Sequence, residues 1–424
     1  MTPGDTIAAV ATAPGRGGVA IVRVSGPDAL AVGRRLTGRE PEAGRASFRR
    51  ICDGATPSAV LDEGLVLAFR APRSYTGEDV VEFHCHGGTV TPRRILEACL
   101  AAGARLARRG EFTERAFLNG KLNYDQAESV LDLVDAKTAR AADAALDGLA
   151  GRRRRELQAL YAAALDLSTR LEHALDVDEA ELPPDFAAAA AADAARIESD
   201  LASALRRVRE GKILRMGARV VLAGPPNAGK SSLMNALLGE GRAIVSDVPG
   251  TTRDSIEEWL DLDGWPVRLV DTAGLRDAAD AIEAEGVRRA EELVERADVV
   301  LGLRTGDWQA DDARLLRIHS KCDLDRGEGL NVSVKTGEGL DELKRAVIAR
   351  LERKAADGDA SDLSGDVAAL QETLALLRAR PAAPDLVLLA NAVRRAAERL
   401  GACLGAAYSA DLLDNLFSRF CVGK

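Results

Sequence analysis

The segment Gly224-Pro225-Pro226-Asn227-Ala228-Gly229-Lys230-Ser231 has the spacing of a phosphate-binding loop, GxxxxGK followed by Ser or Thr. An apolar run at residues 219–223 predicts a buried strand before it, and residues 232–238 predict the start of a helix after it. In such a loop the glycines let backbone N–H groups turn towards phosphates at the positive end of the helix. We therefore expect Lys230 to reach the β- and γ-phosphates of a nucleotide and the Ser231 hydroxyl to ligate magnesium (Mg²⁺).

Two further segments have the residue types to contact the γ-phosphate and its metal ion. Gly250-Thr251-Thr252 offers the Thr252 hydroxyl to Mg²⁺ at a switch-like distance from the loop. A predicted strand at residues 267–271 ends in Asp271-Thr272-Ala273-Gly274, a DxxG pattern. In this pattern Asp271 can hold Mg²⁺ through water, and the Gly274 amide can sense the γ-phosphate.

A fourth and a fifth segment point to guanine as the base. Ser320-Lys321-Cys322-Asp323 sits where G proteins carry NKxD, and Ser333-Val334-Lys335 resembles the SAK element that backs the base. The Asp323 carboxylate can accept hydrogen bonds from the guanine N1–H and 2-amino group, which adenine cannot match. The order and spacing of all five segments predict a GTP-binding domain.

Three departures from that pattern carry information. Ser320 replaces the usual Asn, so we expect one hydrogen bond to guanine or to the phosphate loop to be shortened or lost, at roughly 0.5–1.5 kcal/mol. The segment between Asp298 and Lys321 is short, so we expect its strand and helix to be trimmed. Leu275 follows Gly274 where Ras-like proteins place the Gln that orients water, so another group must position the attacking water.

The 424 residues have room for two to four domains. Their texture, meaning the composition and hydrophobic periodicity along the chain, changes three times. Residues 1–118 predict an α+β domain with strands at 19–24, 64–69 and 79–85 and helices at 28–36 and 93–102. Residues 119–216 predict long helices, with runs at 126–149 and 152–175 and an Ala-rich helix that Asp185 caps after Pro183-Pro184. Residues 217–355 predict an α/β G domain, and residues 356–424 are helical again after a flexible linker at 356–361. The expected fold is multidomain, α+β and α/β, with the G domain inserted in a discontinuous helical domain.

Composition excludes several classes of protein. The charge is 57 Lys+Arg minus 66 Asp+Glu, or −9, which argues against non-specific coating of DNA. No apolar run is long enough to span a membrane, and the start Met1-Thr2-Pro3-Gly4-Asp5 lacks the pattern of a secretory signal. The six cysteines are scattered, which favours reduced thiols and a cytoplasmic location.

Motifs outside the nucleotide-binding segments extend the pattern to both ends of the chain. They are Asp5-Thr6-Ile7, Pro14-Gly15-Arg16-Gly17-Gly18-Val19, Tyr75-Thr76-Gly77-Glu78-Asp79, His86-Gly87-Gly88, Gly110-Glu111-Phe112-Thr113-Glu114-Arg115-Ala116-Phe117-Leu118-Asn119, Gln126-Ala127-Glu128 and Phe420-Cys421-Val422-Gly423-Lys424. Together with the phosphate loop, they resemble the family of tRNA-modification GTPases known as MnmE or TrmE. The resemblance covers all three textures, which a phosphate loop alone could not produce.

The resemblance implies a folate-binding and dimerisation domain at residues 1–118. It places contacts to a tetrahydrofolate derivative (5-formyl- or 5,10-methylene-tetrahydrofolate) on Arg23, Glu82, Lys121 and Lys424. The residues agree in part, since strand alternation puts Glu82 with His84 and His86 on a polar face. Two alternatives stay open: all four are solvated surface charges, or Glu78 takes the role given to Glu82.

The resemblance also implies a homodimer and a flavin-dependent partner, MnmG (GidA). Together they add a (carboxymethyl)aminomethyl group to C5 of the wobble uridine of certain tRNAs. It further implies a potassium ion (K⁺) held by Asn227, Ser246, Val248 and Thr251, and it gives Glu283 the task of aligning the attacking water through a second water. With Lys230 and Asn227, Glu283 completes the expected catalytic set. The whole predicted GTP-binding set is Asn227, Ala228, Gly229, Lys230, Ser231, Ser232, Ser246, Asp247, Val248, Pro249, Gly250, Thr251, Thr252, Asp271, Thr272, Ala273, Gly274, Ser320, Lys321, Asp323, Ser333, Val334 and Lys335.

Other functions fit parts of the sequence. A ribosome-assembly GTPase of the Era or Der kind would share the G domain but needs an RNA-binding module, and the helical tail has no GXXG-centred αβ pattern. A folate-dependent methyltransferase with a vestigial G domain is disfavoured by the intact Lys230, Ser231, Thr252 and Asp271. His84-Cys85-His86 resembles a metal site, but alternating faces of one strand cannot all ligate one ion.

Overall fold

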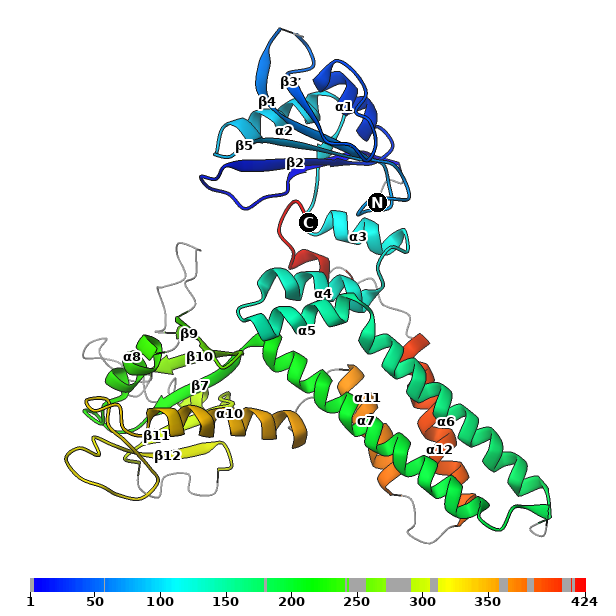
Figure 1. The fold of residues 1–424 in the computed structure, drawn as a ribbon, viewed down its shortest axis with the longest axis vertical. Coiled ribbons are helices and arrows are strands. Elements are labelled where there is room, and N and C mark those ends of the chain that lie inside the picture. The colour runs from blue at the N-terminus through cyan, green and yellow to red at the C-terminus, as the bar shows by residue number, and fades with distance from the viewer. Residues whose placement is uncertain are drawn as a thin grey trace. The chain divides into compact units, whose positions relative to one another are not determined.

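The computed structural model describes residues 4–56, 58–178, 181–240, 242–243, 257–271, 291–305, 312–357, 365–379, 385–405, 413 and 416–424. The chain divides into two compact units. The first comprises Met1–Leu131 and Ala407–Lys424, and the second comprises Asp132–Ala406. Each unit has its own sheet and its own core, and together they give a multidomain α/β layout (Figure 1).

The first unit is built on a six-stranded sheet in the order β3-β4-β5-β2-β1-β6. Its strands are β1 (Ile7–Val10), β2 (Val19–Ser25), β3 (Ser47–Cys52), β4 (Val60–Phe69), β5 (Val80–His86) and β6 (Arg105–Leu106). Every pair is antiparallel except β1 with β6. Helices α1 (Ala29–Thr37) and α2 (Thr91–Ala101) share one buried cluster with β2, β4 and β5, so they cover one face of the sheet. The strands and helices predicted here are confirmed; β1, β3, β6 and the short α3 (Glu111–Leu118) were missed.

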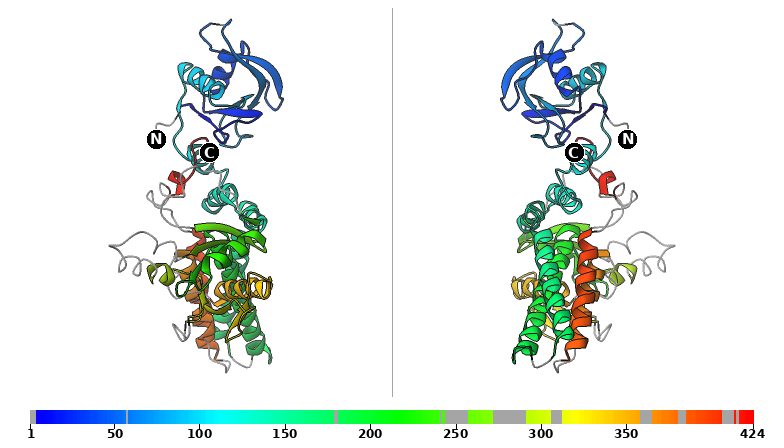
Figure 2. Two further views of the ribbon diagram at one scale, coloured as in Figure 1. Left: turned by 90° about the vertical axis from the view of Figure 1, so that its left-hand side faces the viewer. Right: turned by 90° about the vertical axis from the view of Figure 1, so that its right-hand side faces the viewer.

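The C-terminal residues return to this first unit and lie beside α3 (Figures 1 and 2). Phe417 and Phe420 are buried, and Val422 pairs with Arg109 in an isolated antiparallel bridge. The amide of Phe112 donates to the carbonyl of Lys424 over 3.3 Å. Gly110 has φ 67°, and a Cβ there would lie 2.4 Å from the carbonyl oxygen of Phe417. The tail therefore docks by backbone pairing against a position that only glycine fits.

Four helices of the second unit form a bundle: α6 (Arg152–Asp176), α7 (Phe186–Met216), α11 (Gly365–Arg378) and α12 (Leu386–Gly405). Their shared core contains Leu167, Leu201, Leu370 and Val393, one from each helix, and Figure 2 shows α12 running along α6. None of the helices in the described ranges is both long and apolar enough to cross a membrane. The predicted helical texture of this segment is confirmed.

Three expectations about these helices were wrong. The run at 126–149 is two helices, α4 (Tyr124–Asp135) and α5 (Ala139–Leu149), because Thr138 is extended and its side chain accepts the amide of Ala141 as an N-cap. Asp185 precedes α7 but makes no capping hydrogen bond. The linker expected at 356–361 begins later, since α10 (Leu340–Asp357) continues through its first two residues.

The second unit also holds a seven-stranded sheet in the order β13-β12-β11-β7-β10-β9-β8. The strands are β7 (Ala218–Ala223), β8 (Arg242–Ala243), β9 (Glu257–Leu262), β10 (Trp265–Asp271), β11 (Val299–Leu303), β12 (Leu315–Ser320) and β13 (Leu330–Val332). β7 is central and pairs in parallel with β10 and β11, and β9 turns back antiparallel to β10. This is the α/β texture expected at residues 217–355.

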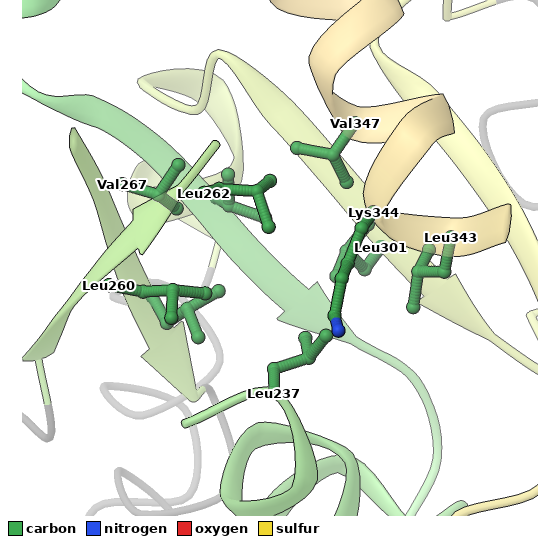
Figure 3. A pocket seen from close by; sticks show the side chains of 10 residues that line it. Leu237, Leu260, Leu262, Val267, Leu301, Leu343, Lys344 and Val347 are labelled. Atoms are coloured by element: carbon green, nitrogen blue, oxygen red, sulfur yellow. The ribbon is translucent and has the colours of Figure 1, made fainter. Parts of the chain in front are cut away.

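Helices α8 (Lys230–Glu240) and α10 pack on one face of that sheet. Figure 3 shows a small cavity between them, where Leu237 of α8 faces Leu343 and Val347 of α10 across Leu260, Leu262, Val267 and Leu301 of the strands. Lys344 is the polar side chain in this lining. A cavity so apolar is a gap in the core packing, not a ligand site.

The β9–β10 hairpin is fixed to the helices by polar contacts. The Arg140 guanidinium of α5 lies 4.2 Å from the centre of the Trp265 ring and pairs with Glu210 of α7. The Thr138 hydroxyl donates to the carbonyl of Gly264, at the tip of the hairpin, over 2.8 Å. Trp265 is buried, and its contact with the Arg140 guanidinium is a cation–π interaction.

Candidate functional site

The predicted phosphate loop leaves the carboxyl end of β7, the central strand, and ends where α8 begins at Lys230. Gly224 has φ 148°, and a Cβ there would lie 2.3 Å from the carbonyl oxygen of Leu303 in β11. Gly229 has φ 94°. Both glycines are therefore required by backbone geometry, and the loop is held close to the neighbouring strand.

Asn227 occupies the left-handed region with φ 62°, which Asn tolerates better than most residues. Its side chain is exposed at the mouth of the loop. Its carbonyl accepts a hydrogen bond of 3.0 Å from the Lys321 ammonium. The loop and the predicted base-recognition segment are thus joined by a direct contact.

Lys230 is buried inside the phosphate loop. Its ammonium donates to the carbonyls of Gly224 and Pro225, each over 3.0 Å. Burial of a lysine amine among backbone groups at a helix N-terminus places fixed positive charge where a phosphate would bind. The geometry is that of an anion site.

Ser231 and Asp271 meet beside this anion site. The Ser231 hydroxyl donates to a carboxylate oxygen of Asp271, the last residue of β10, over 2.6 Å. Asp271 is 3% exposed. Mg²⁺ prefers hard oxygen ligands next to substrate phosphates, and this hydroxyl and carboxylate supply them, so the donor set fits the ion.

The two predicted base-recognition segments lie together at the carboxyl ends of β12 and β13. The amide of Cys322 donates to the carbonyl of Val332, and the Ser333 hydroxyl donates to the Asp323 carboxylate over 2.7 Å. The Ser320 hydroxyl donates to the carbonyl of Ala228 over 2.7 Å. Ser320, which stands where G proteins usually carry Asn, therefore still makes a hydrogen bond to the phosphate loop. The expectation that this bond would be shortened or lost was wrong.

The trimming expected between Asp298 and Lys321 does not affect the strands. β11 and β12 are both formed and pair in parallel from Val300 to Leu303. What is short is the connection between them, residues 304–314, of which 306–311 lie outside the described residues.

Several predicted site residues lie outside the described part of the chain. They are Ser246, Asp247, Val248, Pro249, Gly250, Thr251 and Thr252, then Thr272, Ala273 and Gly274, and finally Glu283. Of the remaining predicted set, Ser232, Val334 and Lys335 are exposed. Their predicted contacts to the nucleotide stay predictions.

A second polar site lies on the sheet of the first unit. Arg23 of β2 stands opposite Glu82 of β5 in register, and its guanidinium donates to the carboxylate over 2.8 Å. The guanidinium lies 5.5 Å from the ring centre of Tyr75 and 5.6 Å from that of Phe112. The Arg23 and Glu82 side chains are only 19% and 14% exposed, so they are not the solvated surface charges that the sequence left open.

The docked tail brings Lys424 to this pair. Burial lowers the pKa of the Lys424 ammonium, and the nearby charge of Arg23 lowers it further. Arg23 and Lys424 thus place two basic groups beside the Glu82 carboxylate. Both groups are able to pair with a carboxylate.

Glu78 and Lys121 have other partners. Both Glu78 oxygens accept from Arg115, at 3.1 and 3.0 Å, and one accepts from Ser25 at 2.8 Å. Glu78 is thus part of a structural ion-pair network, which removes it as the competitor for the role of Glu82. The Lys121 ammonium donates to the carbonyl of Pro72 over 3.1 Å.

The metal interpretation of residues 84–86 fails. Cys85 is buried with a thiol pKa raised by burial to about 11, and its sulfur donates to the carbonyl of Ala20. His84 and His86 pair with Glu82 and Asp62 respectively. Among the described residues, no group of three or more His, Cys, Asp or Glu side chains could hold a metal ion.

Sequence reasoning missed Tyr75 and Phe112, whose rings enclose the Arg23 guanidinium. Both belong to motifs that carried the resemblance, so that signal could have singled them out. It also missed the contacts of Arg304 behind the base-recognition segment, for which the sequence gives no signal.

Two family models match the chain. One, described as the N-terminus of the GTP-binding protein TrmE, matches residues 6–121, and the other, the MnmE helical domain, matches residues 125–421. The tRNA modification GTPase MnmE of Azoarcus sp. (strain BH72) is 43% identical over 450 residues, which cover 100% of this chain and 98% of that protein. The protein of the same name from Aromatoleum aromaticum is 42% identical over 447 residues, covering 99% and 98%.

Among solved structures, the G domain of the FeoB iron transporter of T. maritima is 25% identical and covers 31% of this chain and 98% of that one. The TM-score of this match is 0.25.

Proposed function

The chain belongs to the MnmE (TrmE) family of tRNA modification GTPases, and on that premise we propose how it works and where its ligands bind. It is a GTPase that acts in tRNA modification. We propose that, as a cytoplasmic homodimer with the flavin-dependent partner MnmG, it adds a (carboxymethyl)aminomethyl group to C5 of the wobble uridine. The observation that carries this proposal is the docking of Lys424 beside the Arg23–Glu82 pair.

The nucleotide part of the proposal rests on the contacts of the phosphate loop. Lys230 binds the β- and γ-phosphates, Ser231 and Thr252 hold Mg²⁺, and Asp323 binds the guanine edge. Support comes from the buried Lys230, from the converging oxygens of Ser231 and Asp271, and from the contact of Ser320 with Ala228. Glu283 aligns the attacking water in this proposal.

We also propose the division of labour along the chain. Residues 1–118 bind folate and dimerise, residues 119–216 and 356–424 make the helical domain and its tail, and residues 217–355 are the inserted G domain. The two alternatives weighed from the sequence, a ribosome-assembly switch and a methyltransferase with a vestigial G domain, receive no support from the full-length relatives.

Potassium should stimulate GTP hydrolysis through Asn227. We propose that Asn227 would hold K⁺ together with Ser246, Val248 and Thr251, and that the bound ion would supply positive charge to stabilise the transition state of hydrolysis. Asn227→Ala should abolish the stimulation of hydrolysis by KCl over NaCl at matched ionic strength, with modest loss of GTP affinity. Steady-state phosphate release in the two salts measures this.

Because Asn227 has φ 62°, an alanine there is also strained, and Asn227→Gly provides the control. Glycine removes the amide without backbone strain, so it should lose the potassium response as alanine does. Equal rates in KCl and NaCl for the unmodified protein would contradict the potassium site.

The folate proposal makes Glu82 the acceptor for the ring of a tetrahydrofolate derivative and Arg23 and Lys424 the partners of its carboxylates. Glu82→Ala should weaken the binding of 5-formyl-tetrahydrofolate by at least about tenfold, the usual size of a lost charge-assisted hydrogen bond. Isothermal titration calorimetry on the full chain measures this.

Glu63→Ala is the matched control, because Glu63 lies on β4 of the same sheet and pairs with Arg50 on its exposed surface. It should bind 5-formyl-tetrahydrofolate with unchanged affinity. If Glu82→Ala also binds unchanged, the carboxylate faces no ligand and the folate site lies elsewhere.

A further inference from the structure

Arg304 follows β11 directly, at the edge of the sheet where the phosphate loop and the base-recognition turn meet. Its φ is 51°, in the left-handed region that a long side chain rarely adopts. A residue is held there only when its surroundings fix it. The contacts of its side chain identify what fixes it.

The Arg304 guanidinium spans both ends of the turn that carries Asp323. It donates twice to the carbonyl of Ser320, with Nε at 3.1 Å and a terminal nitrogen at 2.7 Å. The same terminal nitrogen donates to the Asp325 carboxylate over 2.6 Å. The amide of Arg304 donates to the carbonyl of Ile318 over 3.0 Å, so its backbone is also tied to β12.

His319 completes the support. Its Nε2 lies 3.1 Å from the second oxygen of Asp325. The backbone of Gly327 lies so close to the ring that a Cβ there would be 2.2 Å from Nδ1. Gly327 therefore packs directly against the imidazole, and Asp325 is held by two partners, Arg304 and His319.

The opposite side of the turn faces the proposed guanine site. Ser333 holds the Asp323 carboxylate, Ser320 reaches Ala228 of the phosphate loop, and Lys321 is itself left-handed with φ 61°. Two serine hydroxyls therefore hold the side of the turn that faces the proposed guanine site, and Arg304 holds the other side.

Arg304 is the first residue of the short connection between β11 and β12. Parallel strands such as β11 and β12 are usually joined by a crossover of a dozen or more residues, commonly a helix. Here residues 304–314 make the whole connection, which is shorter than that. A fork of guanidinium donors can brace the turn with a single side chain.

We propose that Arg304 is a positioning residue for guanine selectivity. By holding the Ser320 carbonyl and the Asp325 carboxylate, it fixes the turn at residues 320–325 in the geometry that presents Asp323 to the base. This proposal rests on the proposed role of Asp323. It assigns no contact between Arg304 and the nucleotide.

The test compares guanosine diphosphate with inosine diphosphate, which lacks the 2-amino group that Asp323 recognises. Fluorescent derivatives of both are titrated into the full chain. The selectivity ratio is the dissociation constant of inosine diphosphate divided by that of guanosine diphosphate. Arg304→Ala should weaken guanosine diphosphate about tenfold and bring the ratio towards one, because a displaced acceptor no longer distinguishes the two bases. Arg304→Lys should lie between, since an ammonium cannot span both acceptors as the fork does.

Two further variants keep the result decisive. Arg326→Ala removes a neighbouring arginine that pairs with Glu338, and it should leave the ratio unchanged. If Arg304→Ala does not fold, Asp325→Asn, which keeps the shape but weakens the ion pair, must lower the ratio instead.

The outcomes separate this proposal from the function on which it rests. A wild-type ratio in Arg304→Ala, or in both Arg304→Lys and Asp325→Asn, overturns the role of Arg304. A wild-type ratio in Asp323→Asn overturns the base-recognition turn itself. Because a ratio is measured on molecules that bind, partial unfolding of a variant cannot imitate the predicted change.

Discussion

Replacing Asp323 with asparagine should convert the protein from a guanine binder into a xanthine binder. The carboxylate accepts from the guanine N1–H and 2-amino group, whereas the amide presents a donor that repels the 2-amino group and pairs with the 2-carbonyl of xanthine. We expect GTP affinity to fall by at least about a hundredfold, as when a site built for one hydrogen-bond pattern meets the opposite one. Xanthosine triphosphate should then support hydrolysis at a rate close to that of GTP with the unmodified protein.

The local structure should allow asparagine to replace Asp323 without disturbing the turn. The Ser333 hydroxyl donates to one Asp323 oxygen, and an asparagine carbonyl can accept the same bond, so the turn keeps its support. Glu328→Gln is the matched control because it removes one carboxylate from an exposed position in the following loop. It should leave base preference unchanged. An Asp323→Asn protein that still prefers GTP would show that the segment at 320–323 does not read the base.

The sequence was sufficient to predict the strand, turn and helix of the phosphate loop, because that pattern depends on short, local spacings. A strand, a Gly-rich turn and a helix must follow one another for backbone amides to face a phosphate, and β7, the loop and α8 do so. The strict need for Gly224 arises from β11, a strand far along the chain, but glycine at that position is already part of the spacing.

The contact of Ser320 could not be predicted in the same way. A rule that equates a shorter side chain with a lost bond ignores how close the backbone approaches, and here the Ala228 carbonyl is within 2.7 Å of the hydroxyl. Arg304 is harder still, since nothing in its neighbours along the chain indicates that its side chain returns to Ser320 and Asp325. Both depend on tertiary distances that residue type does not encode.

The predicted helix boundaries were wrong for a related reason. Residues 126–149 have good helix formers almost throughout, so propensity predicts one helix. Thr138 ends it because its hydroxyl also donates to Gly264 of the β9–β10 hairpin, a tertiary contact that fixes the break. Likewise, the docking of the tail on α3 joins segments that are far apart in the sequence, and only the family resemblance suggested it.

Deleting Cys421–Lys424 should abolish tRNA modification while leaving GTP hydrolysis intact. The deletion removes the bridge of Val422 with Arg109, the bond from Phe112 to the Lys424 carbonyl, and the ammonium beside Arg23. The phosphate loop and base-recognition turn make their contacts within residues 224–333, in the other unit. We therefore expect 5-formyl-tetrahydrofolate affinity to fall by at least about tenfold, with GTP turnover within about twofold of the full chain.

Lys424→Ala separates charge from docking. This variant keeps the carbonyl that accepts from Phe112, so the tail can stay in place while the ammonium is lost. If the ammonium holds a folate carboxylate, Lys424→Ala should lose folate affinity nearly as far as the deletion does. A deletion that lowers affinity while Lys424→Ala does not would assign the effect to the docked backbone alone.

The most direct measurement is the mass spectrometric profile of nucleosides in tRNA from cells that lack this protein. The account predicts that uridines carrying a (carboxymethyl)aminomethyl group at C5 disappear, that the full chain restores them, and that the chain without Cys421–Lys424 does not. Unchanged levels of these nucleosides in the cells lacking the protein would contradict its assignment to wobble-uridine modification.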